Sequence, residues 1–180
     1  MCSSDLDAYR ETATAWRGSR GCIFSACAAD FLRPPDTSIV WSPAHRCLAL
    51  RSEGGGWRTV IYGPYMKVPA GSWRAEFMLW AEGDIQAGQH IAQVEAFCGP
   101  RGICHSAGVM AEELVGGGAV AQVFFETAEP IADFEFRVHG CSQATVLLRE
   151  VRVYAWTSGS CQPVPDETAG RKGEVEEVFA

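Results

Sequence analysis

Hydrophobic and polar residues alternate most clearly within residues 57–82, around which we expect the fold to be organised. In residues 73–81, apolar side chains occupy every second position and mostly polar ones fill the gaps. A period of two is typical of a β-strand with one buried face and one solvated face. Residues 57–62 are aromatic and β-branched and stop at a Gly-Pro pair, and residues 68–72 have the composition of a turn. The stretch therefore predicts two antiparallel strands of an all-β domain.

The same alternation predicts further strands along the chain. In residues 145–156 it changes phase near Arg149 and Glu150, which predicts a β-bulge. About eight short strands without a convincing helix are typical of an antiparallel β-sandwich, here expected to be jelly-roll-like, rather than of a parallel α/β sheet. The other predicted strands lie in residues 39–41, 47–50, 90–98, 103–112, 119–127 and 131–139. The alternation places four side chains in one core: Phe77, Leu79, Phe134 and Phe136.

The two ends of the chain depart from this pattern. The first six residues, MCSSDL, match the translation of a sequencing-adapter end, and we expect that they were never part of the natural protein. Glycine and proline interrupt residues 7–38, which we interpret as a linker or the edge of a lost upstream domain. Residues 39–157 form the predicted β-sandwich, and the polar residues 158–180 are expected to be a disordered tail.

Composition narrows the range of partners. The 180-residue chain is 47% hydrophobic, which is enough for one sizeable core, and its formal net charge is −7. Nucleic acids and anionic membranes attract basic surfaces, so this charge argues against both as partners. No apolar run approaches the roughly 20 residues that a helix needs to cross a bilayer. We therefore expect a soluble, mildly acidic and cytoplasmic protein.

Three short runs resemble a known type of module. WRTVIYGPY begins at Trp57, VPAG begins at Val68, and FEFRV begins at Phe134. Together they resemble a bacterial β-sandwich of the galactose-binding-like or carbohydrate-binding jelly-roll type, which is attached to glycosyltransferases and other surface-polysaccharide enzymes. The resemblance covers residues 39–156 and implies an accessory domain with a saccharide as partner and a catalytic domain upstream in the same natural chain. It also implies that calcium can stabilise the fold, although the sequence has no matching Asp-rich loop.

Aromatic and arginine side chains on and beside the central strands are the candidate binding residues. Aromatic rings offer flat contact area to a sugar, and arginine can hydrogen-bond its hydroxyl groups. We predict a saccharide site made of Arg58, Tyr62, Tyr65 and Trp80. Trp80 stands out because it lies on the polar side of its own strand. Core packing is the favoured interpretation for Trp57, Tyr62 and Trp73, and it stays open for Tyr65 and Trp80.

Two further groups of polar residues leave alternatives open. The polar row of residues 131–139 can face a ligand across the sheet, although a solvated face is favoured. This row comprises Asp133, Glu135, Arg137 and His139. Three glutamates can supply the pair of carboxyl groups that a glycoside hydrolase needs. However, any acidic β-sandwich has such pairs of carboxyl groups by chance. These glutamates are Glu76, Glu95 and Glu126.

The chain has eight cysteines, which raises the question of disulfides and metals. Cys98 and Cys104 flank a Gly/Pro turn and can form a disulfide in an oxidising compartment. They can also bind zinc together with His105, His139 or Cys141, although the spacing is not that of a zinc knuckle. Free and mostly buried thiols are the favoured interpretation. We expect no resident cofactor.

The sequence lacks the short motifs of several common enzyme classes. It contains no GxSxG nucleophile elbow, no GxxxxGK[ST] or GxGxxG phosphate loop, and no HExxH metal motif. We therefore expect a non-catalytic module that binds or positions glycans. The alternatives are a structural sandwich used for docking or oligomerisation and, less favoured, a divergent metal-dependent enzyme.

Overall fold

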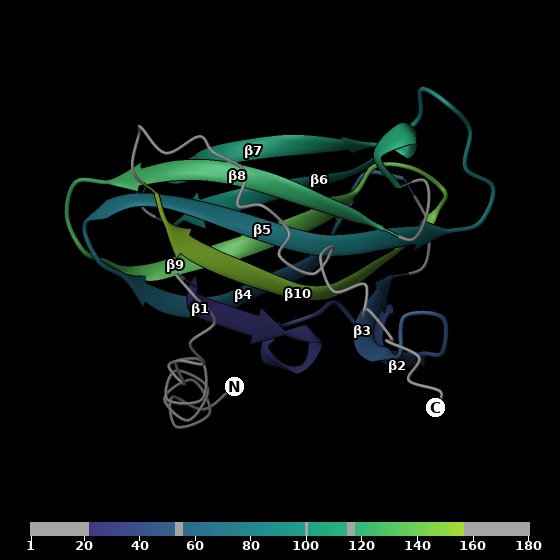
Figure 1. Cartoon of the computed structure of the whole chain (residues 1–180), viewed down its shortest axis with the longest axis horizontal. Coiled ribbons are helices and arrows are strands. Elements are labelled where there is room, and N and C mark those ends of the chain that lie inside the picture. The colour runs from purple at the N-terminus through teal and green to yellow at the C-terminus, as the bar shows by residue number, and fades with distance from the viewer. Residues whose placement is uncertain (1–21, 53–55, 100, 115–117, 157–180) are drawn as a thin grey trace, which may run out of the picture.

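The period-two pattern is realised as two antiparallel β-sheets packed face to face (Figure 1). The computed structural model describes residues 22–52, 56–99, 101–114 and 118–156. These residues form ten strands and two short 3-10 helices, η1 (Ala28–Asp30) and η2 (Ala111–Leu114). The predicted antiparallel β-sandwich is thereby confirmed. The adapter-like start and the expected tail lie outside the described residues.

The larger sheet has six strands, in the order β2-β3-β10-β5-β8 with β1 also paired to β10. β10 pairs with β5 along one edge, and it shares its other edge between β3 and β1. The register of β10 against β5 shifts between Leu148 and Glu150, which confirms the predicted bulge. The strands are β1 (Cys22–Cys27), β2 (Thr37–Ser42), β3 (Cys47–Ser52), β5 (Gly71–Glu82), β8 (Ala119–Thr127) and β10 (Thr145–Ala155).

The smaller sheet has four strands, in the order β4-β9-β6-β7. Its β9 is central, since it pairs with β4 on one side and with β6 on the other. None of the helices in the described part of the chain is long and apolar enough to span a lipid bilayer. The strands are β4 (Arg58–Val68), β6 (His90–Cys98), β7 (Gly102–Met110) and β9 (Ile131–Gly140).

The two central strands, β4 and β5, follow each other in the chain but lie in opposite sheets. They are therefore not paired with each other, and each finds its partners far away in the sequence. β4 also runs past Pro64, where we expected it to stop. Its pairing with β9 shifts register between Gly63 and Met66, so the proline, which has no N–H to donate, lies at an irregularity of the ladder.

The sandwich begins before residue 39, where the sequence had placed its start. Residues 22–27 form β1, which pairs with the end of β10. Burial alternates along this strand, with Cys22, Phe24 and Ala26 inside. Phe31, just after η1, is also buried in the core. The segment is short and flanked by glycines and prolines, so its pairing with a strand more than a hundred residues later was not visible in the local pattern.

The core between the sheets is built from the predicted inward rows. Phe77 and Leu79 of β5 and Phe134 and Phe136 of β9 all belong to one buried cluster, as expected. The Phe136 ring makes an edge-on contact with Phe77 at a centroid distance of 5.7 Å, so the aromatic rings connect the two sheets. Trp73 is also a core residue, as the sequence favoured.

Candidate functional site

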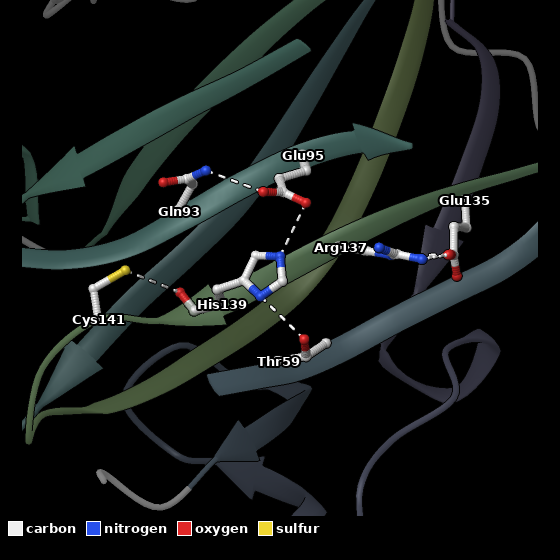
Figure 2. Close-up of polar contacts among 7 residues, drawn as sticks. All are labelled: Thr59, Gln93, Glu95, Glu135, Arg137, His139 and Cys141. Atoms are coloured by element: carbon white, nitrogen blue, oxygen red, sulfur yellow. Dashed lines mark hydrogen bonds and ion pairs between the residues drawn. The ribbon is translucent and has the colours of Figure 1, made fainter. Parts of the chain in front are cut away.

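A chain of hydrogen bonds crosses three neighbouring strands on the outer face of the four-stranded sheet (Figure 2). His139 of β9 is at its centre: Nε2 lies 3.0 Å from Glu95 Oε2, and Nδ1 lies 3.1 Å from Thr59 Oγ1. Gln93 of β6 donates from its amide nitrogen to the other Glu95 oxygen at 3.0 Å. We call Thr59, Gln93, Glu95 and His139 the outer-face network.

The sheet register explains why these side chains meet. His139 lies directly opposite Thr59 on β4 and Gln93 on β6, and Glu95 is the next residue along β6 that points to the same face. Glu95 is only 3% exposed and His139 8%. A carboxylate this buried is stable only when paired and hydrogen-bonded, which the imidazole and the amide provide here.

The predicted solvated face of β9 is therefore wrong for two of its members. Glu135 and His139 do point away from the core, but they are buried, because neighbouring strands contribute side chains that cover them. Asp133 is exposed, in keeping with the prediction, whereas Arg137 is half-buried. Ala132 is on the same side of the alternation as Phe134 and Phe136, but it is exposed near the start of the strand.

Trp57 lies over the network, immediately before β4. Its indole is stacked on the His139 imidazole, with ring centroids 5.4 Å apart and ring planes within 7° of parallel. The side chain is 62% exposed, so the favoured core interpretation of Trp57 is wrong. The ring combines one face held by the protein with a large area open to solvent. That combination suits a platform for a flat, partly apolar ligand.

A second polar pair lies beside the network on the same face. Glu135 Oε1 accepts hydrogen bonds from Arg137, including one from Nε at 2.8 Å (Figure 2). The guanidinium of Arg137 also covers the Phe97 ring. Glu135 Oε2 is buried and accepts no hydrogen bond from the described residues. Burial raises the pKa of the neighbouring Tyr65, and the negative charge of the Glu135 carboxylate raises it further. Tyr65 therefore stays protonated at neutral pH, as a hydroxyl that can donate on this face.

The structure brings together two of the four predicted site residues. Tyr62 lies opposite Arg137 on the outer face, and Tyr65 lies beside Glu135; both are half-buried. Arg58 is held elsewhere, because its guanidinium forms an ion pair with Asp36 and contacts Ser52 Oγ at 3.4 Å. The role of Tyr62 and Tyr65 in ligand binding stays a prediction.

Trp80 does not share a platform with the other three predicted site residues. It points outward from β5, which is in the opposite sheet, and it is only 7% exposed. The His45 ring lies against it at a centroid distance of 4.1 Å, and it packs with Ala49 and Leu147 in a small second cluster. Trp80 does face outward from β5, as its position on the polar side of the strand predicted. However, the β2–β3 hairpin and its loop cover the ring, so an accessible Trp80 is contradicted.

Trp57, Glu95 and His139 form one candidate site in the structure. The sequence analysis did not predict that these three residues come together. Period two correctly assigned His139 to the outward row, and Glu95 was considered only as a hydrolase carboxylate. The regular outward row of residues 131–139 was the available signal. Their convergence depends on pairing between strands that lie about 40–80 residues apart, which no local pattern records.

The alternative metal and disulfide chemistries are not assembled in the described residues. No three His, Cys, Asp or Glu side chains gather there as a metal site, so these side chains do not fit calcium or zinc. Cys98 and Cys104 are free thiols, like the four other cysteines that the structure describes. Glu95 lies in the opposite sheet from the two other candidate hydrolase glutamates.

Cys141 lies beside the network and is expected to make stability depend on pH in alkaline solution. Burial raises the pKa of the Cys141 thiol from 9.0 to about 11; a backbone hydrogen bond from Gln93 lowers it, and the Glu95 charge raises it. The unfolded chain releases this proton near the lower value and the folded protein near the higher one, so folded stability falls between them. Urea unfolding at about pH 8 and pH 10.5 should show a smaller fall for Cys141→Ala than for wild type. If the free energy of unfolding falls equally in wild type and Cys141→Ala, the Cys141 thiol does not cause this pH dependence.

Comparison with known proteins bears on the fold. No family model matches the sequence, and no curated protein matches it. Among solved structures, a carbohydrate-binding module (CBM6cm-2) of lichenase 5A from Cellvibrio mixtus, in complex with cellotriose, aligns with a TM-score of 0.53 and 12% identity, over 76% of this chain and 99% of that one. The C-terminal CBM6 of the laminarinase LamC from Zobellia galactanivorans aligns with a TM-score of 0.51 and 10% identity, over 73% and 98%.

A third structure contains a catalytic module as well. The CBM22-1–GH10 modules of xylanase Xyn10B from Clostridium thermocellum, complexed with xylohexaose, align with a TM-score of 0.52 and 8% identity, over 73% of this chain and 27% of that one. At these identities the similarity establishes the architecture alone. The chain has the β-sandwich fold of these carbohydrate-binding modules.

Proposed function

We propose that this protein is a non-catalytic saccharide-binding module and that its ligand lies on the outer face of the four-stranded sheet. The observation that carries the proposal is Trp57, whose ring is stacked on His139 and yet 62% exposed. Sugar rings have apolar C–H faces that pack on aromatic rings, and hydroxyl edges that need hydrogen-bond partners. The fold, which is that of carbohydrate-binding modules with bound oligosaccharides, supports the same choice.

Polar groups suited to sugar hydroxyls lie on the same face of the sheet as Trp57. Thr59 of the outer-face network is half-buried, and Tyr62 and Tyr65 lie further along β4 on the same face. Within the described residues Glu135 Oε2 is left without a hydrogen bond, so that the neighbouring Tyr65 or a ligand hydroxyl can donate to it. The carboxylates favour a neutral or mildly cationic saccharide over an anionic one.

The expected affinity is weak, on the order of 0.1–1 mM, or about 4–5.5 kcal/mol. Trp57→Ala should raise the dissociation constant about tenfold, equivalent to about 1.4 kcal/mol, because it removes the platform. The measurement is calorimetric titration with soluble oligosaccharides of glucose, xylose, mannose, galactose and glucosamine. Trp41→Ala is the matched control: Trp41 is 59% exposed, but it lies on β2 of the other sheet.

Two results overturn the proposal. Binding that is equally weakened by Trp41→Ala and Trp57→Ala places the ligand elsewhere or marks a general loss of structure. Wild-type protein that binds none of the oligosaccharides at millimolar concentration excludes this function. Release of products in the same titrations contradicts the non-catalytic part.

We also propose that the module belongs to a larger surface-polysaccharide or glycosyltransferase protein. An apolar patch on the β2–β3 hairpin supports a protein neighbour, because Trp41 and Leu48 pair across the hairpin and are 59% and 52% exposed. Contiguous exposed apolar side chains mark protein contacts more often than isolated ones do. Concentration-dependent association that Leu48→Ser abolishes, without any saccharide binding, favours docking or oligomerisation as the main function.

A further inference from the structure

We propose that His139 is the positioning residue of the Trp57 platform, so that protonation of its imidazole strengthens saccharide binding. The proposal rests on the saccharide-binding function proposed above and adds a mode of regulation to it. Its structural basis is the placement of one imidazole between a buried carboxylate, a hydroxyl and the stacked indole.

The contacts of His139 leave its ring little freedom. Each ring nitrogen has a partner on a different strand, Glu95 on β6 and Thr59 on β4. Gln93 holds the Glu95 carboxylate from the far side. With its edges fixed, the imidazole offers a defined surface to Trp57, which lies just outside β4 and stacks on it. Truncation of the imidazole therefore removes the support of the platform without touching the indole.

Protonation changes the strength of each of these contacts. A doubly protonated imidazole donates to both Thr59 and Glu95, and its hydrogen bond to the carboxylate is charge-assisted. A cation within about 6 Å of an indole face is also attracted by the π-system, and the ring centroids here are 5.4 Å apart. In the neutral form one nitrogen only accepts, so Thr59 must donate. The cation–π attraction then disappears, and the hydrogen bond to Glu95 keeps only the charge of the carboxylate. The indole is held more firmly by the protonated ring.

The groups that face His139 come from three strands, and histidine side chains in general change charge between about pH 5 and 8. β6 contributes the Glu95 carboxylate and the neutral amide of Gln93, and β4 contributes the neutral Thr59. On β9 itself, the Arg137 guanidinium is hydrogen-bonded to Glu135. Just after β9, the Cys141 thiol keeps its proton because burial raises its pKa to about 11.

The first arm of the test needs no saccharide. An NMR titration between about pH 5 and 8 follows the His139 ring protons and the Trp57 indole N–H, which is assigned by its loss in Trp57→Phe. We expect the Trp57 resonance to move with the same midpoint as His139, and to stop moving in His139→Gln, which can hydrogen-bond but not titrate. His105→Gln, a change at an exposed histidine on β7, is the matched control and should leave the Trp57 titration intact.

The second arm measures affinity for cellotriose and xylohexaose at both ends of this pH range. The dissociation constant should rise about fivefold or more from about pH 5.5 to pH 8 in wild type. In His139→Gln it should stay near the wild-type alkaline value at both pH values. Replacement of Glu95 by Gln removes the carboxylate that lies 3.0 Å from the imidazole Nε2 and should also flatten the dependence.

The outcomes separate this proposal from the proposed function. A Trp57 resonance that ignores the His139 titration overturns the positioning role, whatever the saccharide results. Coupled resonances with a pH-independent dissociation constant overturn the control of affinity. Coupled resonances with no saccharide binding at either pH confirm the positioning role and overturn the saccharide-binding function together with its regulation.

Discussion

Truncation of Phe136 to alanine is expected to lower the free energy of unfolding by about 3–5 kcal/mol, as deletion of a buried phenylalanine side chain usually does. Phe136 is 0% exposed and is surrounded by the rings of Phe77, Phe125 and Phe134, from both sheets. The cavity left behind lies where the two sheets meet, so neither sheet can close it alone. Denaturant unfolding followed by fluorescence and circular dichroism measures the change.

The matched control for this prediction is Phe124→Ala, the same chemical change on the outer face of β8. Phe124 is half-buried and makes an edge-on contact with Trp156 at 4.9 Å. Its loss should cost at most about half as much, because the surrounding water fills the space that the ring vacates. Equal effects of the two substitutions are incompatible with a core centred on Phe136.

Removal of the His139 imidazole is expected to be the other strongly destabilising change. It leaves the Glu95 carboxylate, which is 3% exposed, without the imidazole that lies 3.0 Å from its Oε2. Breaking a buried pair from one side typically costs about 3–5 kcal/mol, because a charge remains buried without compensation. His139→Ala should therefore lose this much stability at neutral pH, measured by urea unfolding.

Two controls isolate the charge from the loss of packing. Combining His139→Ala with Glu95→Gln leaves no buried charge and should recover much of the lost stability. Arg101→Ala breaks an ion pair with Glu129, whose side chains are 45% and 70% exposed, and should cost about 0–1 kcal/mol. If the double variant is no more stable than His139→Ala, the buried charge is not the cause of the loss.

The architecture was predictable from sequence because it follows from local alternation. Every second residue of β5 and β9 is apolar, and these rows form the core that joins the sheets. The pairing of strands was not predictable in the same way. β4 and β5 were expected to pair because they are consecutive, but the chain crosses between the sheets at the turn that separates them.

The candidate site was predictable only in part, and for a related reason. Alternation assigns a side chain to a face, but exposure depends on what covers that face. Trp80 was assigned correctly to the outer side of β5 and is nevertheless covered by the β2–β3 hairpin and His45. Trp57 has no alternating neighbours to mark it as exposed, since it lies outside a strand. Both outcomes depend on contacts between distant segments.

The outer-face network also shows why a polar row is ambiguous in sequence. Glu135 and His139 look like members of a solvated strand face, since charged residues alternate with the core phenylalanines. Whether such residues are solvated or buried depends on neighbours from other strands, here Glu95 and Phe97 of β6. A buried, mutually bonded set of this kind is a stronger functional candidate than the exposed row predicted from alternation.

The most direct test of the central claim is an NMR titration of the isotope-labelled protein with the saccharide that binds best in the oligosaccharide panel. Residues whose resonances shift define the binding face without any substitution. We predict that the largest shifts occur at the Trp57 indole and at residues of β4, β9 and β6 around His139, while Trp41 and Trp80 remain unaffected. Shifts confined to the six-stranded sheet, around Trp80 or the β2–β3 hairpin, would contradict the assignment of the site to the outer face of the four-stranded sheet.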